Sequence, residues 1–332
     1  MSTRHLALVC EPMSNTWIGV RQLTSVCAAI QKQITSDFYP IWNVRGTIDP
    51  FTSLDDVPLG YWPIIVMDDI KSFKVAGVHQ DRMGQPFSLV KAGQLWSLAA
   101  SHEALEMLAD PSGNRTIAGP RPMTVKTGSS VVEYLVAICD PCEDLHYAYD
   151  INGIPVSDFC TPDYFEPQKP AVDGTRYDIA RQIKEPLDVL PKGYLTWHDS
   201  QAQGWFRLTA SEEHKLSTSF ADVRSSGGRH MRSRIDAQVE SPLEALSLGD
   251  HPSFKFDKLG NGDCTRGSCV ACMTFINALK SQKLLLDGPQ KAAAKPSHSD
   301  ASALREDIAQ VMTDNIAEDM TAVKLARRRK RK

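Results

Sequence analysis

The chain has 332 residues, of which 42% are hydrophobic and 23% charged, so wholesale disorder, collagen and a coiled-coil rod are excluded. The net charge of −3 is an average over unlike parts. Seven Lys or Arg residues and no acidic residue occupy positions 324–332, and without these seven charges the rest carries about −10.

Targeting signals are not found in the sequence. No stretch has the roughly 20 apolar residues of a transmembrane helix, and residues 1–15 lack the long apolar segment of a secretory signal. Eight cysteines in a long chain without an export signal predict a reducing, cytoplasmic location.

The first 110 residues predict an alternation of strands and helices. Apolar runs and turn residues indicate a strand, an amphipathic helix, two strands, a hairpin and a second helix, at residues 5–10, 20–34, 39–44, 62–67, 75–79 with 86–90, and 96–110. Pro111 ends the second helix, because a proline disfavours helical geometry in the residue before it. This order favours an α+β fold with an α/β-like N-terminal half.

The rest of the chain predicts a continuation of the same domain and then a change of character. A strand is expected at residues 131–139 and a hairpin at 147–151 and 154–159, whose Asn-Gly turn suits a type I′ geometry. The predicted segments are a first domain, a cysteine-containing extension with a helix at 270–286, a linker, and an amphipathic helix with a basic tail, at residues 1–210, 211–286, 287–302 and 303–332.

The helix at residues 96–110 carries the most informative polar pattern. At about 100° per residue, with His102 at zero, Glu106 falls near 40°, Asp110 near 80° and Glu103 near 100°. Almost all other positions are apolar, so we expect a largely buried helix whose polar strip faces a cleft. Histidine and carboxylate one turn apart can reach one divalent ion, and this donor set suits zinc. Glu103 lies to the side, where it can take a proton from water.

The segment His102-Glu-Ala-Leu-Glu106 resembles the HExxH motif of zincin metallopeptidases, with Glu106 in place of the second histidine. The preceding order of strands and helix, with a hairpin just before the motif, is also similar to zincins. The resemblance implies a mixed sheet with a motif-bearing active-site helix, followed here by a helical C-terminal extension. It implies His102 and Glu106 as zinc ligands, Glu103 as general base, and a peptide or protein substrate that pairs with the strand at residues 86–90.

A partial resemblance extends to the HExxExxxDP pattern of plant EXORDIUM-like (phosphate-induced) proteins and of uncharacterised bacterial zincin-like proteins. It covers roughly residues 1–210. In that pattern an E-x-x-D segment follows on a strand, and residues 137–140 occupy this place, with Ala137 where the pattern has Glu. This departure makes a catalytically inactive relative, acting as a binding or structural module, the alternative to an enzyme.

The third metal ligand stays open at this point. Asp110 is a candidate ligand because it shares the arc, although it lies two turns beyond His102, about 12 Å along the axis, a distance that argues against one ion bridging both directly. The alternatives to Asp110 are Asp140, Glu133, His79 and Asp158. The competing interpretation is a structural polar cluster, in which His102 is hydrogen-bonded to Glu106 and Asp110 merely ends the helix.

A cysteine-rich segment near residue 270 is a second candidate metal site. Cys264, Cys269 and Cys272 have the first three spacings of a plant-type ferredoxin, but no cysteine follows them. A zinc site there would need His251 or Asp263, and the alternative is free cysteines.

Two further features predict less. Cys139 and Cys142 have redox-motif spacing but do not open a helix, so a redox role is not expected. The basic tail at residues 327–332 predicts contact with nucleic acid or an anionic surface, or a solubilising end.

Overall fold

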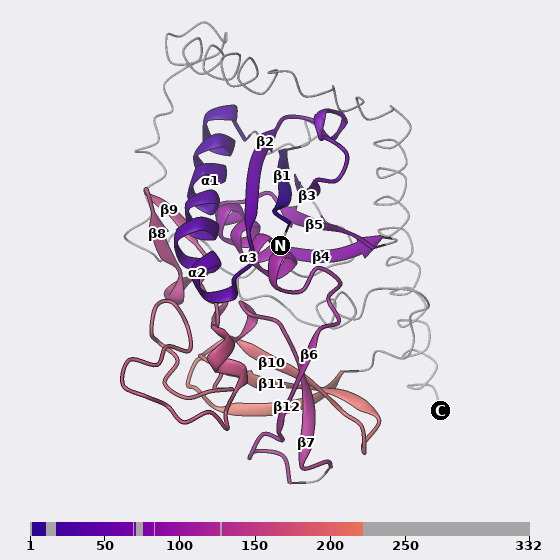
Figure 1. Cartoon of the computed structure of the whole chain (residues 1–332), viewed down its shortest axis with the longest axis vertical. Helices are drawn as coiled ribbons and strands as arrows, with labels where there is room; N and C mark the ends of the chain where they lie inside the picture. The colour runs from indigo at the N-terminus through magenta and orange to yellow at the C-terminus, as the bar shows by residue number, and fades with distance from the viewer. Residues whose placement is uncertain are drawn as a thin grey trace, which may run out of the picture.

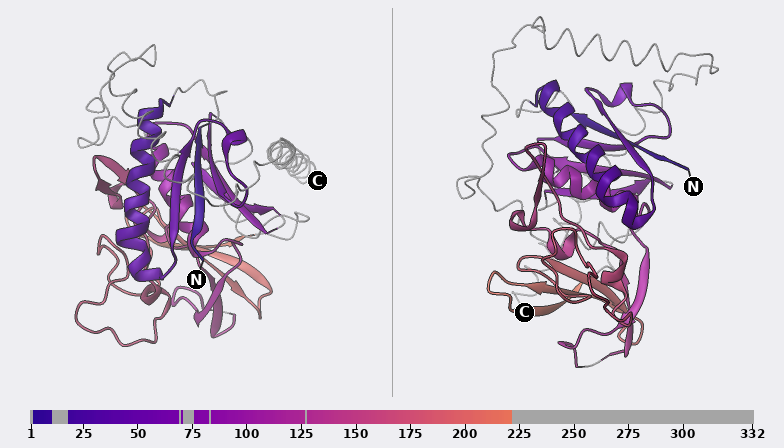
Figure 2. Two further views of the ribbon diagram at one scale, coloured as in Figure 1. Left: turned by 45° about the horizontal axis from the view of Figure 1, so that its top comes forward. Right: turned by 60° about the vertical axis from the view of Figure 1, so that its left-hand side comes forward.

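The computed structural model of the chain describes residues 2–10, 18–68, 70, 76–82, 84–126 and 128–221. These residues form an α+β structure with two five-stranded sheets, which confirms the predicted class at this level. Figures 1 and 2 show the two sheets at opposite ends of the described part. No helix in these ranges is long and apolar enough to cross a membrane. The helices, linker and tail predicted beyond residue 221 lie outside the described residues.

The first sheet is mixed and has the order β2-β1-β3-β5-β4. Its strands are β1 (Arg4–Cys10), β2 (Gly46–Phe51), β3 (Trp62–Met67), β4 (Gly77–Arg82) and β5 (Gln85–Lys91). The first three and β5 are parallel, and β4 runs antiparallel to β5. β1 and β3 are apolar along most of their length because both of their faces are covered. β4 and β5 are consecutive antiparallel strands, which confirms the hairpin predicted before the motif helix.

Helix α1 (Val20–Gln33) continues into helical turns where a strand was predicted. A π-helical turn η1 (Ile34–Phe38) and the short α2 (Tyr39–Trp42) follow it, so the strand at residues 39–44 is wrong. Phe38 and Trp42 are four residues apart and stack at 6.3 Å between ring centroids, which extends the buried face of α1. The missed strand is β2, which carries Pro50 and pairs only with β1, as an edge strand allows.

Helix α3 (Trp96–Ala109) is covered on two sides. It packs against β3, β4 and β5 of the first sheet and against the hairpin strand β9 (Ile154–Val156). All of its residues are buried, as the mainly apolar sequence predicted. The hairpin partner β8 (Tyr149–Ile151) is shorter than expected, and its turn residues Asn152 and Gly153 both have positive φ, in agreement with a type I′ turn.

The second sheet is antiparallel throughout and has the order β12-β11-β10-β7-β6. Its strands are β6 (Thr116–Pro120), β7 (Val131–Leu135), β10 (Tyr194–Asp199), β11 (Gly204–Ala210) and β12 (Leu216–Ala221). β12 pairs with β11 along its length, so the second sheet extends to residue 221, beyond the boundary predicted after residue 210. β7 ends at Leu135, so the last four residues of the strand predicted at 131–139 are not in the sheet.

One apolar core joins the two sheets. It contains the helix-facing residues of the first sheet, the buried faces of α1 and α3, and Tyr134 and Trp197 of the second sheet. A smaller cluster covers the other face of the first sheet. The segment that connects β7 to the β8–β9 hairpin therefore runs against α3.

Candidate metal centre

Helix α3 carries two of the groups that could bind a metal. His102 and Glu106 lie one turn apart, and the imidazole Nε2 is 3.9 Å from Glu106 Oε1. The helix ends where the sequence predicted, because Asp110 precedes a proline and leaves the helical region at φ −138° and ψ 79°. No side chain caps the start of α3, so its position depends on packing.

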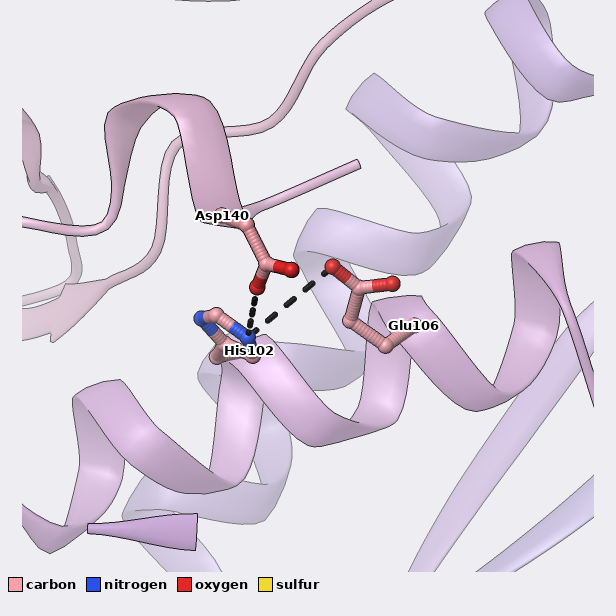
Figure 3. A group of neighbouring side chains, drawn as sticks. All are labelled: His102, Glu106 and Asp140. Carbon is pink, nitrogen blue, oxygen red and sulfur yellow. Dashed lines mark ion pairs between the residues drawn. The ribbon is translucent and has the colours of Figure 1, made fainter. Parts of the chain in front are cut away.

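The third group comes from the segment after β7. Asp140 opens a short 3-10 helix, η3 (Asp140–Cys142), and its Oδ1 lies 3.3 Å from His102 Nε2. The backbone N–H of Cys139 donates to Glu106 Oε1 at 2.7 Å, which fixes this segment on α3. Figure 3 shows His102 and Glu106 projecting from one helix toward Asp140 on the neighbouring turn.

The three groups have a spacing that fits a metal ion. Each of His102, Glu106 and Asp140 offers one ligand atom, and these atoms lie within 4.8 Å of one another. Zinc ligands at about 2.0–2.1 Å in a tetrahedral site are roughly 3.3 Å apart, so the widest pair of ligand atoms would have to close by up to about 1.5 Å when zinc binds. His102 Nδ1 is buried and has no hydrogen-bond partner among the described residues. The second ring nitrogen of a ligating histidine is usually bonded, so this centre has less outer support than most.

The centre is enclosed and strongly acidic. His102 is 7% exposed, Glu103 5%, Asp140 2% and Glu106 not at all, so the polar strip that was predicted to face a cleft is almost fully buried. Burial lowers the pKa of His102, but the three surrounding carboxylates, first of all that of Asp140, raise it more, and it reaches about 10. The metal-free imidazole is therefore a cation that neutralises part of the carboxylate charge.

Glu103 lies beside the three groups and faces the edge strand β4. A Cβ on Gly77 would lie 2.6 Å from Glu103 Oε1, so a larger residue at position 77 would require the Glu103 side chain to move. Glu103 is also one of the charges that raise the pKa of His102. It is therefore adjacent to the centre without belonging to the three-atom group.

Asp110 is not part of the centre, which corrects its assignment as a ligand. Its Oδ2 accepts the backbone N–H of Arg115 at 2.8 Å, and its carbonyl lies 3.1 Å from Nε2 of His79. Both contacts hold the turn after α3 and the edge strand β4. The helical phase placed Asp110 on the correct face, but its rise along the axis takes it away from His102.

Of the four alternatives for the third ligand, the structure brings only Asp140 to the group. His79 is engaged at the end of α3, and the carboxylate of Glu133 pairs with His198 on the surface at 3.4 Å. Asp158 is buried elsewhere, where its Oδ1 accepts the N–H groups of Phe159 and Ile179. Asp140 was expected on a strand and instead lies on η3, because its segment turns away from the sheet toward Glu106.

Asp158 forms a buried acid pair with Asp178 that gives a prediction on stability. Burial raises the pKa of Asp158 well above its usual range, and its hydrogen bond with Asp178 raises it further. The stability contributed by the protonated form is complete below the unfolded pKa of about 3.9 and is lost as the pH rises toward the folded pKa. Asp158→Asn keeps both the acceptor and the donor, so its unfolding free energy should decline less than that of the wild type between pH 4 and pH 8.

Urea unfolding at several pH values measures this difference, with the exposed Asp173→Asn as the control. Asp173→Asn should follow the wild type. An Asp158→Asn variant with the wild-type pH profile would show that Asp158 is ionised in the folded state.

The cysteines near the centre are thiols without ligand geometry. Cys139 Sγ lies 3.9 Å from the carbonyl oxygen of His102, and Cys142 is hydrogen-bonded to Cys160. Burial, first of all, raises the pKa of Cys142 well above its usual range, which disfavours the reactive thiolate. Cys264, Cys269 and Cys272, with His251 and Asp263, lie outside the described residues. The contact that sequence analysis missed is the Cys139 N–H on Glu106, for which the sequence has no signal.

In comparisons with known protein families, with curated proteins and with solved structures, nothing matches this chain. The geometry and chemistry of the centre are therefore the basis for assigning a function.

Proposed function

We propose that this chain is a zinc-dependent hydrolase of the zincin type that acts on peptide bonds. His102, Glu106 and Asp140 would hold the ion, and Glu103 would be the general base. The observation that carries this proposal is the convergence of one imidazole and two carboxylates from two segments on a space of 4.8 Å. Zinc bound there would supply Lewis-acid polarisation of a substrate carbonyl.

The arrangement of the first sheet supports the zincin proposal. The strand, helix, strand, strand, hairpin, helix order that carried the resemblance is present once β2 replaces the strand expected at residues 39–44. The strand expected to hold the substrate, at residues 86–90, lies in β5 and is paired on both sides, so that expectation is wrong. β4 is the outer strand of the sheet, and an extended peptide would add to its backbone instead.

Glu103 would handle the proton of such a reaction. It would accept a proton from the attacking water as the new carbon–oxygen bond forms. It would then return that proton to the leaving amine as the carbon–nitrogen bond breaks, so one water is consumed for each peptide bond. General-base catalysis of this kind contributes typically about 10²–10⁴-fold to a rate.

A second function is favoured by the burial of the centre. Glu103 is 5% exposed, and Ala137 stands where the related pattern has a glutamate. The same metal group would then stabilise a binding module for a peptide or protein partner, without turnover. The cytoplasmic location and the contact of the tail at residues 327–332 with nucleic acid or an anionic surface remain predictions.

Metal content tests the proposal. We expect the full chain, stripped of metal and reconstituted, to retain about one zinc per chain, His102→Ala to lose it, and Glu103→Gln to keep it. Peptide-library hydrolysis that falls at least about 100-fold in Glu103→Gln would support the hydrolase. Stoichiometric zinc without Glu103-dependent hydrolysis would support the binding module. A wild-type chain that binds no zinc would overturn both.

A further inference from the structure

Gly193 lies directly before β10 and is held from two directions. Its N–H donates to the carbonyl of Leu190 at 2.8 Å, and its own carbonyl accepts the N–H of Ala210 at 3.2 Å. Ala210 is the last residue of β11, and it also binds the residue before Gly193, because the N–H of Lys192 donates to the carbonyl of Ala210 at 2.8 Å. The second sheet therefore fixes the backbone at this point.

Gly193 also lies against the backbone of η3, closest to the carbonyl group that joins Pro141 to Cys142. A Cβ at position 193 would be 2.4 Å from the carbonyl oxygen of Pro141 and 2.9 Å from that of Asp140. Both are backbone atoms, so no side-chain rotation can relieve the clash. The N–H of Leu190 donates to the same Pro141 oxygen at 3.0 Å. Residues 190–193 thus contact the backbone of the segment that carries Asp140 and restrict its position.

Space, and not backbone angle, requires glycine at this position. Gly193 is not among the glycines of positive φ, so alanine could adopt its conformation. Side-chain carbons essentially never approach other atoms closer than 3.0 Å, so the 2.4 Å contact of an alanine would have to open by at least 0.6 Å. Functional groups generally have to be held to within about 0.5 Å. An opening of this size exceeds that tolerance, and the backbone atoms that would have to move belong to Pro141 and Asp140.

We propose that Gly193 is a positioning residue of the metal centre, which sets the place of Asp140 relative to His102 by letting the second sheet approach η3. The role of Gly193 rests on the proposed metal centre and adds to it a structural link to β10. It acts through Asp140 and touches none of the three ligand atoms. Loss of such outer support typically weakens metal binding by about 10–100-fold.

Zinc titration of Gly193→Ala in the full chain tests this role, with Gly93→Ala as the matched control. A Cβ on Gly93 would meet nothing within 4 Å and needs no positive φ. We expect zinc affinity about 10–100-fold weaker in Gly193→Ala and within about two-fold of wild type in Gly93→Ala. Equal affinities in Gly193→Ala and the wild type would overturn the proposal.

Two further readouts separate this proposal from the metal centre itself. The ¹⁵N shifts of the His102 imidazole, at one pH without metal, should change in Gly193→Ala and not in Gly93→Ala if Asp140 has moved. A wild-type chain without zinc affinity would overturn the metal centre, whereas the imidazole shifts would still report on Gly193.

The stability of metal-free Gly193→Ala provides a further test of this role. If metal-free Gly193→Ala is unfolded, the zinc concentration that restores the fold gives the affinity by linkage. Recovery only at higher zinc than the wild type needs for saturation supports the role of Gly193. No recovery at any zinc concentration would overturn it and leave Gly193 a purely structural residue.

Discussion

Asp140→Asn should weaken zinc binding by more than about 100-fold, because loss of outer-shell support alone costs about 10–100-fold and here a ligand is lost. The same change should destabilise the metal-free protein. Asp140 Oδ1 lies 3.3 Å from a protonated His102, and both side chains are almost fully buried. Removing one partner of a buried ion pair costs about 3–5 kcal/mol when the other charge is left unpaired, and less here because Glu103 and Glu106 remain beside His102. Zinc titration and urea unfolding of the metal-free chain measure the two effects.

Glu133→Gln is the matched control for Asp140→Asn. Glu133 is another carboxylate from the region around β7 and was an alternative ligand in the sequence, yet its side chain is 56% exposed and pairs with His198. A surface ion pair contributes about 0–1 kcal/mol, so this variant should bind zinc as the wild type does and unfold at nearly the same urea concentration. Zinc binding by Asp140→Asn at wild-type affinity would remove Asp140 from the centre.

The parts of the fold that were predictable are those with a strong local pattern. The amphipathic pattern of α1 gave a correct element because it matches the helical period. Residues 39–44 were wrong because a short apolar run suits a strand and a helix equally well. Trp42 belongs to the helical stripe of α1 only because it stacks on Phe38 and donates its Nε1–H to Cys160, 118 residues away.

The candidate site likewise has a part that the local sequence predicts and a part that it does not. His102, Glu103 and Glu106 could be predicted because helical phase is a property of the local sequence. The place of Asp140 could not be derived from phase, since it depends on the N–H of Cys139 bonding to Glu106 and on Gly193 packing against the backbone of Pro141 and Asp140. Asp110 was included by phase and excluded by distance. Long-range backbone contacts therefore decided which carboxylate completes the group.

Zinc binding should release about one proton per ion at pH 7.5. The acidic surroundings hold the pKa of metal-free His102 at about 10, against a usual value near 6.5, so the imidazole must lose a proton before Nε2 can bind a metal. Below about pH 10 the proton therefore competes with zinc for Nε2 of His102. Apparent affinity should therefore rise about tenfold per pH unit between pH 7 and pH 9 and level off near pH 10.

The free energy of unfolding of the metal-free chain should instead fall as the pH rises. Because the folded pKa of His102 is raised, the stability that its charged form contributes is complete below about pH 6.5 and is lost as the pH rises through about 10. High pH thus weakens the metal-free fold and strengthens metal binding, so the stabilisation given by zinc should grow from pH 7 to pH 9.

Titration calorimetry in two buffers of different ionisation enthalpy counts the released protons, and Glu103→Gln provides an internal comparison. Glu103 is one of the charges that raise the pKa of His102 and is not a member of the ligand group, so its neutralisation should lower that pKa without removing a ligand. The variant should bind zinc with a shallower dependence on pH. Zinc affinity that is flat from pH 7 to pH 9 in the wild type would mean that His102 is neutral or is not a ligand.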